Sequence, residues 1–348
     1  MLHGRTLQEL ATEIERQNEV KRDYLVDTQE LQMRVNADGV AELAFADREL
    51  GMNDIIHGQL AEKLAIPARY YERMREEQPQ LLASNVNTWF TANPARRMVR
   101  TLDNTARAYL SDSYRRIDNY EIAQAVLPLI AEMAGAQVMS CELTERKMYL
   151  KVVNPRIETE ISKGDVVQSG LIISNSETGH GSVSVMPLIY RLVCSNGMIA
   201  RDQGTRKFHI GRVNESDENY EIYSSDTVQQ DDKAFILKLR DTVHAAVEQS
   251  RFNAIVDKMR DGKQLAITGE IPAVVELAGK SLGFTEVENK NILDHLIRGG
   301  DLSLFGMSSA VTRAAQDVTN YDRSTEMEAV GWQVLNVEPQ TWRMWNAA

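Results

Sequence analysis

The sequence has little cysteine and no long apolar run, and each of these shortages excludes a class of protein. Two cysteines in 348 residues cannot build a disulfide framework, which favours a reducing compartment. No apolar run approaches the ~20 residues that a membrane-spanning helix needs. We therefore expect a cytoplasmic protein that has no contact with a membrane.

The sequence also lacks the common motifs of catalysis and metal binding. It has no Walker-type glycine loop, no GxGxxG after a strand, no GxSxG elbow, and no CxxC or HExxH spacing. Its six histidines are scattered along the chain. These absences predict that the protein holds no metal and no cofactor and is not an enzyme. If it were one, His180 and the neighbourhood of Asp112 would be the candidates.

Acidic residues outnumber basic ones, 50 against 39, giving a formal charge of −11. A protein that bound a polyanion with its whole surface would be basic, so a nucleic-acid contact here requires a local patch. Residues 91–120 contain six arginines against three aspartates, a local charge of +3. Residues 201–213 also reach +3. The alternative interpretation of each stretch is a solvated face, and charge alone does not decide between a nucleic-acid contact and a solvated face.

Hydrophobic periodicity predicts an α+β fold in which a central antiparallel β-meander packs against helices, with helical lobes at both ends. Residues 1–117 form the expected N-terminal lobe, mostly helical with one small hairpin around Asp38-Gly39. Residues 118–260 form the α+β core. Residues 261–348 form the C-terminal helical lobe, which docks on the core through Trp342 and Trp345.

Alternating runs in the middle of the chain predict the five strands of the meander. We expect strands at residues 138–142, 148–152, 166–174, 183–193 and 206–213. Between the third and fourth lies the sequence SNSETGHGS, which we interpret as a long hairpin tip. Asn196-Gly197 is interpreted as a tight turn after the fourth strand. One long helix is expected at residues 228–259.

The stretch from Arg96 to Glu121 mixes arginines with tyrosines, a combination typical of proteins that follow a phosphate backbone and stack bases. The competing interpretation is a structural connection whose arginines pair with nearby aspartates and whose tyrosines are half-buried. Under the first interpretation, the nucleic-acid-binding residues are Arg96, Arg97, Arg100, Arg107, Tyr109, Tyr114, Arg115, Arg116, Arg191, Arg206, Lys207 and Arg212.

Four phrases carry a resemblance to a known family. These are QLAEKLAIPARYYERM, RAYLSDSYRRID, RLVCSNGM and FGMSSAVTRAAQDVTNYDRSTEMEAVGWQVL, spread between about Asp54 and Trp342. They resemble the phage/plasmid-like protein family, a domain of unknown function carried by phages, plasmids and integrated elements. The resemblance implies a mobile-element origin and the cytoplasm of a host cell. The order of elements is also similar to that of single-strand annealing recombination proteins.

Two functions follow as expectations. The first is a non-catalytic protein that binds single-stranded DNA in phage or plasmid recombination or replication. The second is a protein-interaction factor that antagonises host defence or restriction, in which the acidic surface meets a host or phage protein. Because a meander has two open edges, we also expect a homo-oligomer, with Trp342, Trp345 and the long helix as candidate contact surfaces.

Overall fold

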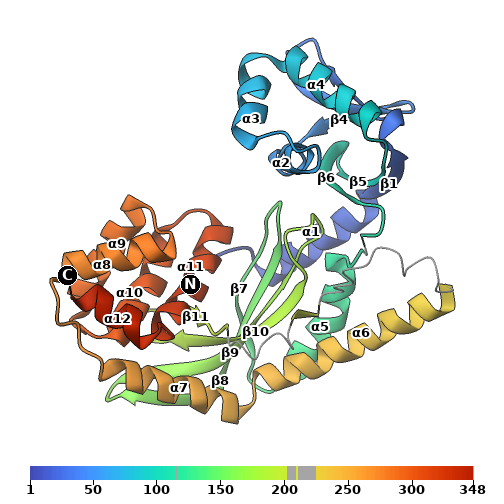
Figure 1. The fold of residues 1–348 in the computed structure, drawn as a ribbon. Helices are drawn as coiled ribbons and strands as arrows, with labels where there is room; N and C mark the ends of the chain where they lie inside the picture. Colours follow the sequence, from blue (N-terminus) through green and yellow to red (C-terminus); the bar gives the residue numbers. More distant parts are fainter. Residues whose placement is uncertain (115, 202–208, 211–224, 348) are drawn as a thin grey trace.

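Figure 1 shows the computed structural model, which describes residues 1–114, 116–201, 209–210 and 225–347. The chain builds an N-terminal lobe, a central sheet, and a group of C-terminal helices beside that sheet. The predicted α+β class, with an antiparallel meander against helices, is confirmed. None of the helices in the described part of the chain has the length and apolarity to cross a membrane.

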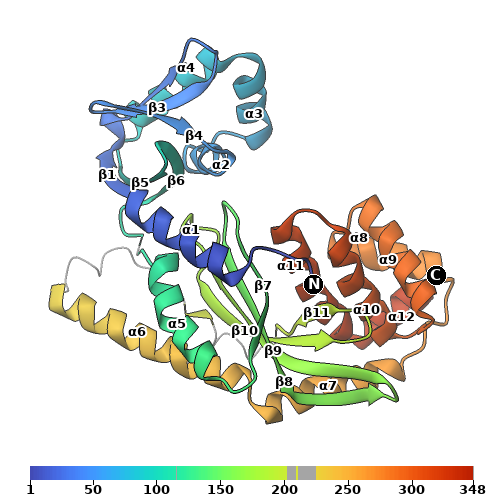
Figure 2. The same ribbon diagram turned by 180° about the vertical axis from the view of Figure 1, so that it is seen from behind.

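The N-terminal lobe combines three helices with a six-stranded sheet of order β1-β5-β6-β4-β3-β2. The strands are β1 (Arg22–Asp27), β2 (Gln32–Val35), β3 (Ala41–Phe45), β4 (Arg48–Met52), β5 (Arg96–Leu102) and β6 (Thr105–Ser111). The helices are α2 (Asp54–Lys63), α3 (Ala68–Glu77) and α4 (Pro79–Ala92), with a single 3-10 turn η1 (Thr28–Glu30). Helix α4 packs against β2 and helix α2 against β6 (Figure 2, seen from behind).

This lobe holds more strand than the sequence predicted. The expected hairpin is present as β2 and β3, with Gly39 at φ +81° in its turn. The strands β5 and β6 were not expected, since most residues on both of their faces are buried. Burial on both faces removes the alternation of apolar and polar residues by which a half-exposed strand is recognised.

The central sheet has the order β11-β10-β9-β8-β7, and every neighbouring pair is antiparallel. Its strands are β7 (Gln137–Leu143), β8 (Met148–Ser162), β9 (Asp165–Asn175), β10 (Val183–Arg191) and β11 (Asn196–Ile199), and the short β12 (His209–Ile210) also pairs with β10. Helices α1 (Leu7–Val20) and α5 (Asn119–Glu132) share one hydrophobic core with this sheet.

The turn that precedes β11 differs from the expected one. The chain reverses at residues 192–195, with Ser195 at φ +50°, and Asn196 already pairs with Arg191 inside the sheet. Gly197 is not part of the turn; it allows close packing inside the sheet. A Cβ at that position would lie 2.8 Å from Sδ of Met1 and 3.0 Å from Cδ1 of Leu188.

The expected helix at residues 228–259 consists of two helices, α6 (Ser225–Ala246) and α7 (Gln249–Lys263). The apolar faces of these two helices pack into different hydrophobic cores. Leu239 and Val243 of α6 belong to the core that also contains residues of α5. Phe252 and Val256 of α7 instead pack with C-terminal residues. The chain must therefore change direction between the two helices, as Figure 1 shows below the sheet.

The C-terminal helices are α8 (Ile271–Leu282), α9 (Glu286–Gly299), α10 (Leu304–Ala314), α11 (Tyr321–Leu335) and α12 (Pro339–Asn346), with a 3-10 turn η4 (Ala315–Asp317) after α10. Trp342 and Trp345 are buried in the core of this group, so they do not offer a surface to a second copy. One edge of the sheet is partly covered, since Arg5 bridges to Cys141 of β7. Homo-oligomerisation stays a prediction.

Candidate functional site

Two of the predicted DNA-binding arginines form buried ion pairs at the junction between the N-terminal lobe and the central sheet. The Arg100 side chain is 0% exposed, and it donates to Asp23 at 2.8 Å and to Asp118 at 2.6 Å. The Arg107 side chain donates to Glu177 at 2.6 Å. Guanidinium groups that are enclosed and paired in this way have no free face for a phosphate.

The predicted tyrosines are also part of the structure at this junction. Tyr109 is 1% exposed in the core of the N-terminal lobe, and the Arg97 guanidinium lies over its ring, 5.9 Å from the centroid. The hydroxyl of Tyr114 donates to the carbonyl oxygen of Ser176 at 3.2 Å. Burial raises the pKa of both phenols. The Tyr109 ring is therefore not open for base stacking, and the Tyr114 ring is half-buried.

The remaining predicted residues do not gather in one place. Arg191 makes a two-pronged ion pair with Asp165, at 2.6 and 2.7 Å. Of the predicted set, only Arg96 and Arg116 have exposed side chains within the part of the chain that the structure describes. Four predicted residues lie outside the described residues, namely Arg115, Arg206, Lys207 and Arg212.

The hairpin tip between β9 and β10 connects the N-terminal lobe to the central sheet. On the lobe side, Arg100 donates to the carbonyl oxygen of Glu177, and Gln59 donates to that of Thr178. On the other side, the Ser176 hydroxyl donates to the carbonyl oxygen of Arg146 at 2.8 Å, in the turn between β7 and β8. The tip is thereby held against this turn.

Beyond the tip lies a polar cavity of about 740 Å³ beside the central sheet. The turn between β7 and β8, the hairpin tip, strands β8 to β11 and the start of α11 all contribute to its lining. The lining residues are Arg146, Lys147, Tyr149, Ile172, Ser174, His180, Gly181, Ser182, Ser184, Met186, Ile199, Arg201, Asn320, Asp322, Arg323, Thr325 and Glu326.

Three cations of this cavity have no carboxylate partner among the described residues: Arg146, Lys147 and Arg201. Arg323 differs, because it pairs with Glu288 at 2.7 Å and with Glu326 at 2.8 Å.

The cavity's Asp322 is held by hydroxyl groups instead of a cation. It accepts a hydrogen bond from Tyr149 at 2.7 Å and one from Thr144 at 3.1 Å. Both bonds end on the same carboxylate oxygen, Oδ1. These bonds fix the carboxylate at the start of α11 and leave the three lysine and arginine side chains unneutralised.

The positive charges in the cavity lower the pKa values of neighbouring basic groups. Burial lowers the pKa of Lys147, and the nearby Arg201 guanidinium lowers it further. Burial also lowers the pKa of His180, with further contributions from Arg146 and Lys147, so its imidazole is neutral at pH 7. Like charges held close together disfavour their own charged forms, and a bound anion relieves this cost.

Sequence reasoning missed most of this site. The sequence singled out two of the lining residues: Arg201, in the basic stretch at residues 201–213, and His180, as a candidate only if the protein were an enzyme. Arg146 and Lys147 belong to a polar turn between two expected strands and were not singled out. The one available signal was that two basic residues precede a buried strand directly. Nothing in the sequence indicated that α11, more than 100 residues away, completes the cavity.

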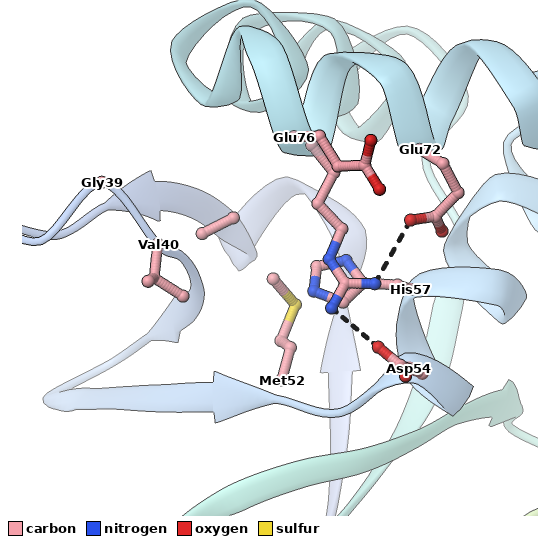
Figure 3. Close-up of a pocket in the computed structure, with 9 residues that line it drawn as sticks. Gly39, Val40, Met52, Asp54, His57, Glu72 and Glu76 are labelled. Carbon is pink, nitrogen blue, oxygen red and sulfur yellow. Dashed lines mark hydrogen bonds and ion pairs between the residues drawn. The ribbon is translucent and has the colours of Figure 1, made fainter.

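A second cavity, of about 650 Å³, lies in the N-terminal lobe (Figure 3). Its one guanidinium, from Arg75, is already paired with Asp54 at 2.7 Å and with Glu72 at 3.3 Å. Its His57 is buried, and Nδ1 lies 2.9 Å from the Tyr71 hydroxyl. Burial, together with the Arg75 charge, lowers the pKa of His57 to about 4. This cavity offers an anion no free positive charge.

Residues 107–262 match the model of a family described as a domain of unknown function (DUF932). The matched segment includes the central sheet, helices α5 and α6, and Arg146, Lys147 and Arg201 of the cavity. No curated protein and no solved structure matches the chain. The match therefore connects the cavity with an uncharacterised family and assigns no activity to it.

Proposed function

We propose that this chain is a non-catalytic nucleic-acid-binding protein that holds single-stranded DNA by its phosphates at the cationic cavity. The observation that carries the proposal is the group of Arg146, Lys147 and Arg201, none of which forms an ion pair with a carboxylate among the described residues. Phosphate oxygens are the acceptors that such lysine and arginine donors suit best. The resemblance to phage/plasmid-like proteins supports a role in the recombination or replication of mobile elements.

A single strand suits this cavity better than a duplex does. The cavity is bounded by the hairpin tip and the start of α11, and it is hollowed into the protein. A flexible strand can bring one or two phosphates into such a space, whereas duplex DNA is stiff over about 150 base pairs. The formal charge of −11 is consistent with a local contact of this kind.

The experiment is fluorescence anisotropy with a labelled 20-nucleotide single strand at ~50 mM salt, where phosphate contacts are strong. We compare the wild-type protein with the double variant Lys147→Met/Arg201→Gln. The matched control is Lys290→Ala, because Lys290 is an exposed cation of α9 that does not line the cavity.

We expect the wild-type protein to bind, with a salt slope of about −0.7 for each phosphate neutralised. The double variant should bind at least about tenfold more weakly, since hydrogen bonds to charged groups contribute about 1.5–3 kcal/mol each. Lys290→Ala should bind as the wild type does. If the wild-type protein fails to bind at ~50 mM salt, the proposal is wrong, and a protein-interaction factor becomes the better account.

A further inference from the structure

We infer that the cavity receives a terminal phosphate monoester, at the end of a strand or on a free nucleotide, in preference to an internal phosphodiester. The inference rests on the proposed function, since it names which phosphate that site selects. Three features of the cavity lead to it: the charge of its lining, its size and its hydroxyl donors.

The charge of the cavity lining corresponds to a dianion. Arg146, Lys147 and Arg201 contribute three positive charges and Asp322 one negative charge. Arg323 pairs with Glu326 of the lining at 2.8 Å and also with Glu288, which is not part of the lining, at 2.7 Å. The lining residues therefore carry a formal charge of +2. A phosphate monoester carries about −1.5 to −2 at pH 7, whereas a phosphodiester carries −1. A diester would leave part of the cluster unneutralised.

The size of the cavity points the same way. Its volume of about 740 Å³ lies within the range of small-molecule sites, about 300–1,000 Å³. Proteins that bind the interior of a single strand use grooves that follow roughly 4–16 nucleotides. A cluster of cations confined to one cavity is better suited to bind a terminal phosphate group than to bind a continuous phosphate backbone.

Hydroxyl groups and an apolar wall complete the site. Ser182 lines the cavity near the hairpin tip and can donate a hydrogen bond to a phosphate oxygen. Ser174 and Ser184 also line it and share one hydrogen bond of 2.8 Å, so the accepting hydroxyl of that pair keeps its own proton to donate. Gly181, beside Ser182, has no side chain to separate the tip from Lys147, whose Nζ lies 3.6 Å from the position that a Cβ would take. Ile172, Met186 and Ile199 supply apolar surface for a sugar or base.

The test measures binding of four forms of one single strand: linear with a 5′-phosphate, linear with a 3′-phosphate, linear with both ends unphosphorylated, and circular. Adenosine monophosphate and inorganic phosphate serve as competitors, to distinguish a strand end from a free nucleotide. The proteins are the wild type, Lys147→Met/Arg201→Gln, the charge-conserving Arg201→Lys, and Lys290→Ala. Melting temperatures confirm that each variant is folded.

We expect one of the phosphorylated linear strands to bind at least about tenfold more tightly than the circular strand. The double variant should lose this preference, and Arg201→Lys should keep most of it. Equal binding of all four strands, weakened alike by the double variant, would overturn the inference and leave the proposed function standing. If adenosine monophosphate binds and no strand does, the inference stands and the proposed function is wrong. If neither adenosine monophosphate nor any strand binds, the inference and the proposed function are both wrong.

Discussion

Arg107 and Glu177 form a buried ion pair, 2.6 Å long, between strand β6 of the N-terminal lobe and the hairpin tip of the central sheet. The other carboxylate oxygen of Glu177 accepts a hydrogen bond from the backbone N–H of Asn119, at the start of α5. The opposite side of the same tip lines the cationic cavity. One pair of residues thus fixes the lobe, the first turn of α5 and one wall of the candidate site.

The first prediction concerns this pair. Arg107→Met leaves the Glu177 carboxylate buried without its cation, so we expect the free energy of unfolding to fall by about 3–5 kcal/mol. Urea denaturation measures the change. Arg96→Met is the matched control, because Arg96 is exposed on the neighbouring strand and should change stability by no more than about 0.5 kcal/mol. Equal stability of Arg107→Met and the wild type would show that the pair has no structural role.

The second prediction is that Lys147, a residue of the proposed phosphate site, lowers the stability of the folded protein. Its pKa is lowered in the folded protein, so at neutral pH its charged form is less favourable in the folded state than in the unfolded state. Lys147→Met should therefore raise the free energy of unfolding by about 0.5–2 kcal/mol. This increase in the free energy of unfolding should be largest at pH 7, where Lys147 is charged. It should shrink as pH rises toward the ordinary pKa of lysine, because the wild-type side chain then loses its charge. A loss of stability at pH 7 would contradict this prediction.

The third prediction is a pH dependence that comes from His57. The folded protein keeps this imidazole neutral with a pKa of about 4, while the unfolded chain protonates it near pH 6.5. Stability should therefore fall as pH drops from about 6.5 to 4, with a contribution from His57 of up to about 3 kcal/mol. Urea midpoints at pH 7.0 and 4.5 measure it. His57→Asn, which does not titrate, should show a smaller difference between the two pH values than the wild type.

The fourth prediction tests how closely α10 and α11 pack. A Cβ on Gly331 of α11 would lie 2.3 Å from Cγ2 of Thr312 and 3.3 Å from the carbonyl oxygen of Ser308. Gly331→Ala should destabilise the protein by about 1–3 kcal/mol and displace the helix that carries Asp322. Gly58→Ala is the control, because a Cβ there meets nothing within 4 Å, and it should not destabilise α2. Thermal denaturation compares the two.

The sequence predicted the central meander well because its strands carry strong local patterns. Strands β7, β9 and β10 lie close to where alternating residues placed them, and the hairpin β2–β3 was recognised by Asp38-Gly39. Strand β8 begins at Met148 as expected but continues to Ser162, ten residues beyond the expected end. The break between α6 and α7 was missed, since both helices continue the same helical spacing. What separates them is the position of two different cores, which is a property of the folded chain.

The candidate site was predicted poorly for a physical reason. Arginine is the same residue whether it meets a phosphate or an aspartate 77 residues away, as Arg100 meets Asp23. Local charge density therefore could not separate a binding surface from a buried ion-pair network. The cavity that contains Lys147 is assembled from a turn, a hairpin tip and a distant helix, so no stretch of sequence contains it.

The most direct test of the central claim compares two double variants by salt-dependent binding of one 5′-phosphorylated single strand. Arg96→Ala/Arg97→Ala removes the exposed Arg96 and the half-buried Arg97 of β5, and Lys147→Met/Arg201→Gln removes two cations of the cavity. We predict that the first variant keeps the wild-type affinity to within about threefold, whereas the second binds at least about tenfold more weakly with a flatter salt dependence. The opposite result, with binding lost in the β5 variant and kept in the cavity variant, would contradict the account.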